Sequence, residues 1–180
     1  LEPELDIEVS LAVFDAQEGL QFEMLRRNAS PEEWKPVTSD EASPRGMTPL
    51  FDAIGAMLTV ADADKPERAV FVVMTDGEEN SSRELTKDNV KARLDKARKK
   101  GWEVVFLGAE FANFADASSV GITQTKSMAV SKDGMEETMR RLSTKSKAYG
   151  AATDAQAAPI EFDEADREAA GEEDVKNKPQ

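Results

Sequence analysis

The sequence predicts an α/β fold with a mainly parallel central sheet and an antiparallel hairpin strand at its edge. Two continuous apolar runs of strand length, residues 69–75 and 103–109, are typical of parallel strands buried on both faces. Segments with apolar residues at helical spacing lie between and after these runs. The order strand, strand, helix, strand, helix, strand, helix predicts three layers, with helices covering both faces of the sheet.

The first two strands are expected to form a hairpin. Residues 7–14, IEVSLAVF, are mostly apolar and predict a well-buried strand. Turn-forming residues at 15–19 separate this strand from the alternating segment 20–25, which predicts an antiparallel second strand. Residues 28–47 contain three prolines, and we expect an irregular connection there.

Two helices are expected before the run at 103–109. The first begins at Thr48-Pro49, because threonine can cap a helix and proline suits the first helical position. Its apolar face recurs at intervals of three and four residues, at Leu50, Ile54, Met57 and Leu58. The second helix follows Thr86 as N-cap and ends before Gly101, with an apolar stripe at Val90, Leu94 and Ala97.

The C-terminal part of the chain changes character after residue 150. We expect a short helix at 111–118, a weaker strand at 122–130 and a helix at 134–148. Residues 151–180 contain nine acidic and three basic residues and few apolar ones. This composition predicts one domain over residues 1–150 and an acidic, largely disordered tail over 151–180, in which only Pro159-Ile160-Glu161-Phe162 docks.

Composition excludes several classes of function. The formal charge of −13 opposes binding to nucleic acid and to anionic membranes, so no partner of either kind is expected. The chain contains no cysteine and no histidine, which excludes disulfides, thiolate zinc sites and Ser-His or Cys-His catalysis. No apolar run reaches the ~18 residues of a membrane-spanning helix, and no signal peptide is visible. We therefore expect a cytoplasmic protein, although the sequence opens at Leu1 and not at Met.

Two loops carry residues that could bind a metal ion. In open α/β sheets, ligands bind beyond the carboxyl ends of the strands. Thr48 would present a hydroxyl there at a helix start, and Asp76 a carboxylate at a strand end. Oxygen ligands of this kind suit Mg²⁺, Mn²⁺ or Ca²⁺. Each residue also has a simpler interpretation: Thr48 as a helix cap, Asp76-Gly77 as a turn, and the neighbouring acids as solvated charges, namely Asp52, Glu78 and Glu79.

These two segments resemble a known family. GMTPLFDAI and VVMTDGEEN are similar to the second and third segments of the metal-ion-dependent adhesion site (MIDAS) of von Willebrand factor type A (vWA) domains. VSLAVFD and KKGWEVVFLGAEF resemble strands of that family, and TDGEENSSRE resembles stand-alone vWA proteins of bacteria and phages. The resemblance covers about residues 5–150 and implies a Rossmann-like vWA fold in which Thr48 and Asp76 belong to the metal site.

The resemblance also implies a function. In the family, the bound metal keeps an open coordination position that an acidic side chain of a partner protein completes. We therefore expect a non-enzymatic, Mg²⁺-dependent protein-binding module. Members without a working metal site act as assembly scaffolds, and a metal-free scaffold is the alternative.

One departure from the family affects this expectation. The first MIDAS segment, Asp-x-Ser-x-Ser after a central strand, does not occur in the sequence; Asp40-Glu41-Ala42-Ser43 does not follow an apolar strand. Loss of that strand would split the sheet and leave unpaired edges on both sides of the gap. We expect the segment to lie upstream of Leu1, with another chain, the C-terminal segment or a rewired sheet as alternatives. The residues present would bind Mg²⁺ weakly by themselves.

A third hypothesis is a metal-dependent phosphoester hydrolase. It would need a two-metal cluster of converging carboxylates, drawn from Asp15, Asp52, Asp76, Glu78 and Glu79. Against it, the sequence shows no Lys- or Arg-rich groove, no histidine base, no P-loop and no Gly-rich dinucleotide fingerprint.

Overall fold

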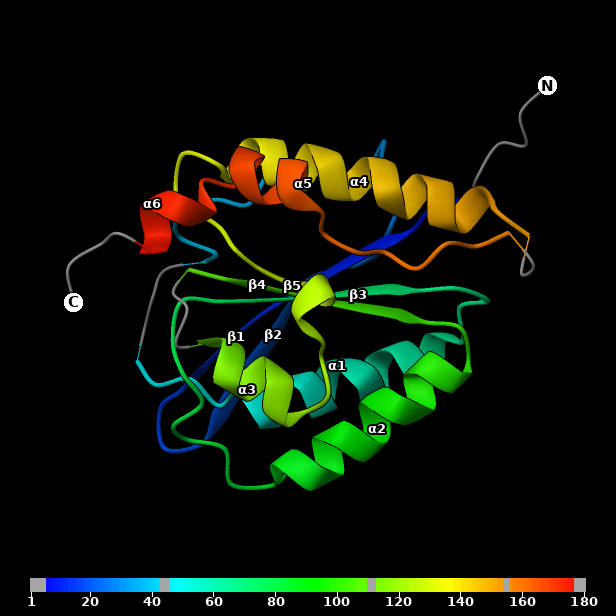
Figure 1. Cartoon of the computed structure of the whole chain (residues 1–180). Helices are drawn as coiled ribbons and strands as arrows, with labels where there is room; N and C mark the ends of the chain where they lie inside the picture. The colour runs from blue at the N-terminus through cyan, green and yellow to red at the C-terminus, as the bar shows by residue number, and fades with distance from the viewer. Residues whose placement is uncertain (1–5, 43–45, 110–112, 154–155, 177–180) are drawn as a thin grey trace.

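The computed structural model describes residues 6–42, 46–109, 113–153 and 156–176, and Figure 1 shows them as a mixed α/β structure. A two-stranded antiparallel sheet contains β1 and β2, and a three-stranded parallel sheet has the order β3-β4-β5. The predicted mixture of parallel strands, helices and an antiparallel hairpin is therefore confirmed. The strands form two sheets, however, and not the single sheet expected.

The hairpin joins β1 (Val9–Ala16) to β2 (Leu20–Ala29). Its tight turn uses positive φ angles at Glu18 and Gly19, conformations that glycine adopts without steric cost. The second strand extends beyond the predicted residues 20–25, and irregular register near Val9 and Leu11 bends the far end of the pair.

The parallel sheet contains β3 (Val70–Thr75), β4 (Glu103–Gly108) and β5 (Ser127–Ala129). The two apolar runs of the sequence form β3 and β4, paired in register from Val70↔Glu103 to Thr75↔Gly108. The third strand is shorter than the predicted 122–130, because residues Gln124–Lys126 form a 3₁₀ turn before it.

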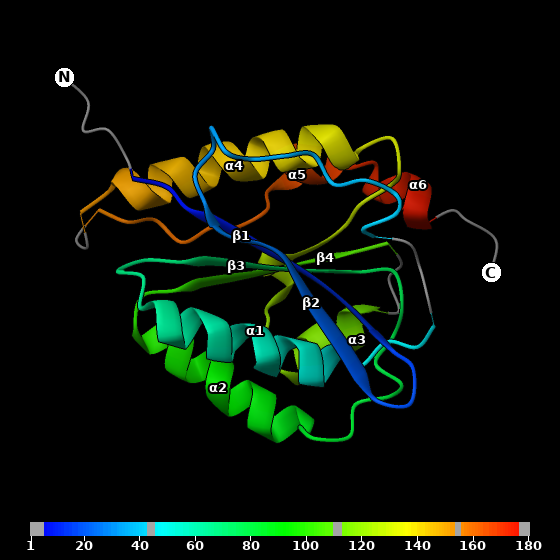
Figure 2. The same ribbon diagram turned by 180° about the vertical axis from the view of Figure 1, so that it is seen from behind.

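Helices lie on both faces of the parallel sheet (Figures 1 and 2). One face carries α1 (Leu50–Asp64), α2 (Lys87–Lys99) and α3 (Asn113–Ser119), and the other carries α4 (Met135–Ala151) and α5 (Glu164–Ala169), with α6 (Glu172–Lys176) beyond it. The predicted cap at Thr86 is confirmed. The Thr86 hydroxyl accepts the backbone N–H of Asn89, and the Asn89 side chain accepts the backbone N–H of Thr86. For the helix predicted at 111–118, residues 110–112 lie outside the described part of the chain.

Each face of the parallel sheet has its own apolar core. Beneath α1 and α2 the core includes Phe71, Val73, Leu94 and Phe106, and Phe14 of the hairpin packs against it. Beneath α4 the core includes Val105, Leu107, Met128 and Leu142. Burial of these side chains is the main favourable contribution to folding.

One part of the α4 face is left uncovered. Along β3, Phe71, Val73 and Thr75 are buried towards α1, whereas the alternate residues Val72 and Met74 are 38% and 41% exposed. Parallel strands are normally covered on both faces. The exposed pair adjoins the edge of β3 at which the described residues contribute no neighbouring strand.

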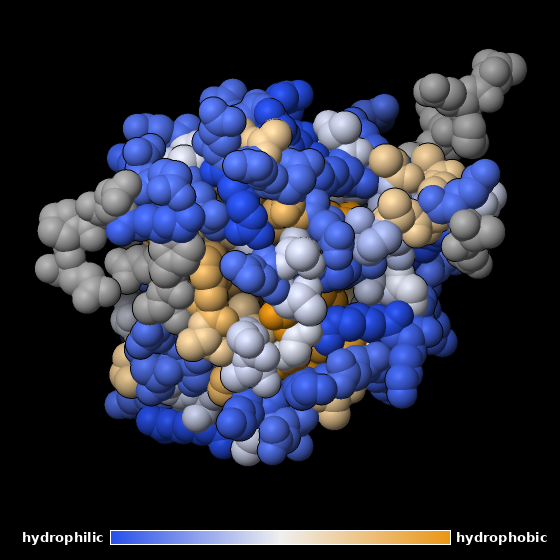
Figure 3. All heavy atoms as spheres, viewed as in Figure 1, coloured by the Kyte–Doolittle hydropathy of each residue, from blue (hydrophilic) through white to orange (hydrophobic). Residues whose placement is uncertain are grey.

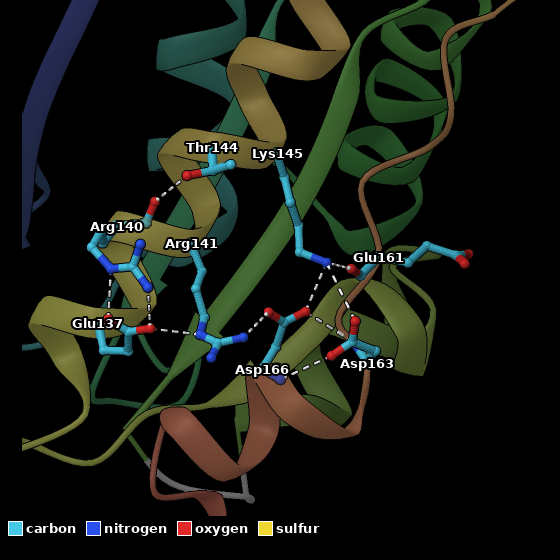
Figure 4. A network of polar contacts seen from close by, with 8 residues as sticks. All are labelled: Glu137, Arg140, Arg141, Thr144, Lys145, Glu161, Asp163 and Asp166. Carbon is cyan, nitrogen blue, oxygen red and sulfur yellow. Dashed lines mark hydrogen bonds and ion pairs between the residues drawn. The ribbon is translucent and has the colours of Figure 1, made fainter.

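The C-terminal segment differs from the predicted disordered tail. Ile160 and Phe162 are buried, as their expected docking requires, but α5 and α6 follow and bury Ala170, Glu172 and Val175. Figure 4 shows how the acidic residues are accommodated: the Asp166 carboxylate lies 2.8 Å from Lys145 Nζ and 3.5 Å from Arg141 Nη1. The basic partners lie on α4, so the acidic composition of the tail alone did not reveal them.

A helix that crosses a membrane must be long and apolar. Within the described ranges, no helix combines the length and the apolar character that crossing a membrane requires.

Candidate functional site

The two loops singled out in the sequence are joined directly to one another. Thr48, which precedes α1, donates its backbone N–H to Asn80 Oδ1 at 2.8 Å. The Asn80 N–H returns a bond to the Thr48 carbonyl at 3.2 Å. This reciprocal pair connects the start of α1 to the loop that follows β3, and so fixes the distance between the two predicted ligand segments.

Thr48 and the Asp76-Gly77 turn are in close contact. A Cβ atom at position 77 would lie only 2.4 Å from Thr48 Oγ1, so glycine is required for this approach. Gly77 directly follows Asp76, whose side chain is exposed, while Thr48 is half-buried. The structure thus brings together the two loop positions that sequence reasoning chose.

Thr48 does not cap α1. The N-cap residue is Pro49, and no side chain makes a cap bond from that position. The first turn is satisfied instead by the other loop: Phe51 N donates to Glu79 Oε2 at 2.9 Å and Asp52 N to Ser82 Oγ at 3.1 Å. The interpretation of Thr48 as a helix cap, and of Pro49 as the first helical residue, is therefore wrong.

Asp52 is buried and holds the loop that follows β3. Its carboxylate is 4% exposed and accepts three backbone N–H groups, from Arg83 at 2.7 Å, Glu84 at 3.1 Å and Leu85 at 2.7 Å. The interpretation of Asp52 as a solvated surface charge is wrong. Three charge-assisted bonds to one carboxylate offset the cost of its burial and fix the path of residues 83–85.

Glu79 organises the same loop from within. Its carboxylate accepts the N–H groups of Ser81 and Ser82 at 2.9 and 2.8 Å, as well as the Ser82 hydroxyl at 2.7 Å. Glu79 is therefore a second exception to the predicted solvated charges, whereas Glu78 is exposed as expected. The Glu79 N–H in turn donates to Asp116 Oδ2 of α3 at 2.7 Å.

Sequence reasoning missed three residues that build this site: Asn80, Ser82 and Asp116. Asn80 and Ser82 lie in the stretch EENSS, where short polar side chains after a strand are a signal for local side-chain-to-backbone bonds. Asp116 comes from a separate helix, and no local pattern connects it to Glu79.

The site keeps its negative charge. In the described ranges, no Lys or Arg forms an ion pair with the five carboxylates here, those of Asp52, Asp76, Glu78, Glu79 and Asp116. A hydroxyl and a carboxylate are hard oxygen donors that suit Mg²⁺, Mn²⁺ or Ca²⁺ in kind. Yet in residues 6–42, 46–109, 113–153 and 156–176 no three acidic side chains converge on a metal-sized position. Thr48 and Asp76 are thus two oxygen-bearing residues on adjoining loops.

These loop hydrogen bonds argue against the metal-dependent hydrolase. Of the carboxylates that a two-metal cluster could use, Asp52 and Glu79 are occupied by backbone N–H groups. These bonds direct both side chains into the loop and make them structural.

Comparison of the chain with protein-family models, with curated proteins and with solved structures gave no match in any of the three.

Proposed function

We propose that this chain is the greater part of a vWA-type domain that binds a protein partner through a divalent cation held at Thr48 and Asp76. The observation that carries the proposal is the placement of Thr48. Its hydroxyl is not used to cap α1, and it packs against Gly77, the residue that follows the exposed Asp76. A threonine packed against an aspartate-glycine turn at the carboxyl end of a parallel strand is in keeping with the arrangement that the family resemblance implies.

The chemistry of the two side chains suggests a different role for each towards the cation. Thr48 would ligate the cation directly or through water, and the exposed Asp76 would act by its charge, most simply through water. Mg²⁺ is the expected ion, with Mn²⁺ and Ca²⁺ as alternatives. When bound, the cation supplies an open position that takes an acidic side chain of the partner, so the module needs no catalytic residue. The missing donors would come from an Asp-x-Ser-x-Ser segment outside the described residues.

The division of the strands into two sheets supports the proposal that a central strand comes from outside the described residues. Among the described residues, β1 forms a ladder with β2 and β3 forms one with β4, and β1 has one further bridge, from Ala16 to Met47. Both views show β1 and β3 running in the same general direction (Figures 1 and 2). A strand parallel to both would join the two sheets into one, giving the order β2-β1-strand-β3-β4-β5 of a single Rossmann-like sheet.

Crossover handedness supports the same proposal. The step from β3 to β4 passes through α2 on the α1 face. A right-handed crossover that moves in the opposite direction, from the inserted strand to β1, must place its helix on the α4 face. That face is the one on which Val72 and Met74 are uncovered. One strand and one helix would thus satisfy the open edges and the exposed apolar pair together.

The metal site is tested by titrating the ¹⁵N-labelled chain with Mn²⁺ alone. Paramagnetic Mn²⁺ broadens the amide signals of nearby residues, so we expect selective loss of the Thr48, Asp76 and Gly77 signals, with weak affinity because the donor set is partial. Thr48→Val and Asp76→Asn should abolish the selective broadening. Glu78→Gln, which removes an exposed acid two residues from Asp76, is the matched control and should leave it unchanged.

Three results would contradict the proposal. Uniform broadening that follows surface acids, or selective broadening that survives both substitutions, would exclude a site at Thr48 and Asp76. If a protein that includes the missing strand also binds no divalent ion, the metal-free assembly scaffold replaces the adhesion module.

A further inference from the structure

Helix α2 differs in charge from the rest of the molecule. Residues 87–100, which are α2 and the residue after it, contain seven basic and two acidic residues, a net charge of +5 in a chain whose formal charge is −13. Figure 3, in the view of Figure 1, shows mainly hydrophilic side chains over the lower edge of the molecule, where α2 lies. The chain therefore presents a basic surface although its total charge is strongly negative.

The two flanks of α2 differ in how their basic residues are paired. On one flank, Asp95 forms ion pairs with both Lys91 and Arg98, each at 2.9 Å. On the flank that faces α1, three basic residues recur at intervals of three and four positions and so share one side of the helix. These residues are Arg93, Lys96 and Lys100. The first flank thus carries its own acidic partner, whereas the second depends on other elements for one.

A groove with a volume of about 300 Å³ lies between this second flank and α1. It is lined by Leu58, Thr59 and Asp62 of α1 and by Arg93, Lys96 and Ala97 of α2. Among these lining residues the one acid is Asp62, which pairs with Lys100, and Lys100 Nζ also lies 4.9 Å from the centre of the Trp102 ring. The charge of Lys100 is therefore used within the molecule. Sequence reasoning did not predict a basic groove, because its two walls come from separate helices.

Arg93 is held in place without a carboxylate. Its Nη1 donates to the Gly55 carbonyl at 3.2 Å and to Thr59 Oγ1 at 3.3 Å, and both acceptors are uncharged. Its Nε and Nη2 donate to no group in the part of the chain that the structure describes. These two donors form an edge of the guanidinium that can pair with a carboxylate through two parallel bonds. Contacts with α1 thus position Arg93 and leave that edge open to an anion.

Lys96 is the second basic residue of the groove that has no acidic partner. It is exposed, and over residues 6–42, 46–109, 113–153 and 156–176 its ammonium forms no ion pair or hydrogen bond. The pKa of the Asp62 carboxyl is lowered, first by the hydrogen bond from Lys100 and further by the charges of the surrounding basic residues, which include Lys96. Three cations around one acid leave the groove with a net charge of +2.

We propose that the groove between α1 and α2 binds an acidic segment of a partner protein, whose carboxylates pair with Arg93 and Lys96. Charge complementarity selects this partner, and carboxylates three or four residues apart on a helix match the spacing of the two cations. The groove is distinct from the candidate metal site, because its α1 residues lie in the second half of that helix, whereas Thr48 precedes the first turn.

A protein segment suits the groove better than nucleic acid does. The total of −13, with +5 on residues 87–100, leaves −18 on the remainder of the chain, which repels a long row of phosphates. Asp62 also places a negative charge within the groove itself. A short segment with a few carboxylates can reach Arg93 and Lys96 without following the acidic surface beyond them.

The test measures binding of the full chain to a synthetic helical peptide that carries glutamates three and four residues apart, in the presence of EDTA. Amide signals of the ¹⁵N-labelled chain should shift at Thr59, Arg93 and Lys96, and the anisotropy of a labelled peptide gives the Kd. Arg93→Gln/Lys96→Gln should weaken binding about tenfold, because it removes both unpaired cations. EDTA removes the divalent ions that the metal site would need, so this test and that of the metal site can fail independently.

A matched variant separates the groove from general charge attraction. Lys87→Gln/Lys91→Gln removes the same charge from exposed positions on the other flank of α2 and should change the Kd by no more than about twofold. A peptide with glutamine in place of glutamate should not bind, and a DNA duplex should bind more weakly than the acidic peptide. Equal weakening by the two double variants overturns the proposal. Tighter binding of the duplex, amide shifts away from the groove, or an acidic peptide that does not bind at all also overturns it.

Discussion

Two regions of this molecule bury carboxylates, and they satisfy them in different ways. Beside the candidate site, Asp52 accepts backbone N–H groups, and no Lys or Arg pairs with it within the described residues. At the C-terminus, Asp166 is 3% exposed and is bonded by the side chains of Lys145 and Arg141 from α4. Burial of an ionised group is costly in both places, and both arrangements offset that cost.

The difference lies in the charge that remains. Backbone amides satisfy hydrogen-bonding capacity without adding a unit charge, so the loop around Asp76 retains a negative potential available to a cation. Cationic side chains neutralise their carboxylate, so the C-terminal network is closed on itself and serves structure. The contrast teaches that the number of acids in a segment says less about its role than the kind of partner each acid has.

The largest effect is expected from Asp52→Ala, which would break the first arrangement. It leaves the N–H groups of residues 83–85 without their shared acceptor in a partly buried loop. We expect the free energy of unfolding to fall by about 3–5 kcal/mol, measured by urea denaturation. Asp52→Asn retains one acceptor oxygen and should cost less. A loss below about 1 kcal/mol for Asp52→Ala would show that water satisfies these amides equally well.

The second effect tests the C-terminal arrangement through its pH dependence. Burial raises the pKa of Asp166. The hydrogen bonds from Lys145 and from the backbone N–H of Asp163 lower this pKa by more than burial raises it, so the net pKa is depressed. The folded state therefore binds this proton less readily than the unfolded state. The resulting stabilisation is present above the unfolded pKa of about 4 and is lost as the pH falls through the folded value.

Asp166→Asn should remove this contribution. We expect a loss of about 2 kcal/mol at pH 7, from urea denaturation, that shrinks as the pH falls below about 4. Glu168→Gln, an exposed acid on the same helix, should change stability little at either pH. A variant that loses the same free energy at pH 7 and pH 3 would show that the Asp166 side chain contributes by packing and not by charge.

The two regions also differ in how far the sequence predicts them. The apolar runs at β3 and β4, the Thr86 cap and the juxtaposition of Thr48 with Asp76-Gly77 follow from local patterns, because each depends on neighbours in sequence or on the shared edge of parallel strands. The partners of Asp166 and Glu172, and the bond from Glu79 to Asp116, join segments 5 to 37 residues apart through the tertiary fold. The charge composition of a segment does not show which acids have such partners, and it therefore predicted a disordered tail.

Gly77→Ala should have the third largest effect, because it acts on the contact that defines the candidate site. The added Cβ would meet Thr48 Oγ1 at 2.4 Å, so one of the two loops must move. Overpacking of this kind costs about 1–2 kcal/mol, measured as a change in the free energy of unfolding. Thr48→Ala removes the clashing atom, so the double variant should recover most of the loss. Additive losses would show that Gly77 is constrained by something other than Thr48.

The smallest effect is expected at Glu137, which repeats the cationic arrangement in a solvent-exposed setting. The hydrogen bond from Arg140, followed by that from Arg141, lowers the pKa of this carboxyl to about 2. Because this pKa is lower in the folded than in the unfolded chain, the ionised Glu137 carboxylate stabilises the fold at pH values above its unfolded pKa. The stabilisation is lost as the pH falls towards 2. Because solvent screens an exposed pair, Glu137→Gln should lower the free energy of unfolding by less than Asp166→Asn does, and 1 M salt should reduce its effect further.

A carboxyl titration by NMR should place the Glu137 midpoint near 2 and move it upward in Arg140→Ala. An unchanged midpoint in that variant would contradict the assignment and leave Arg141 as the residue that lowers the pKa.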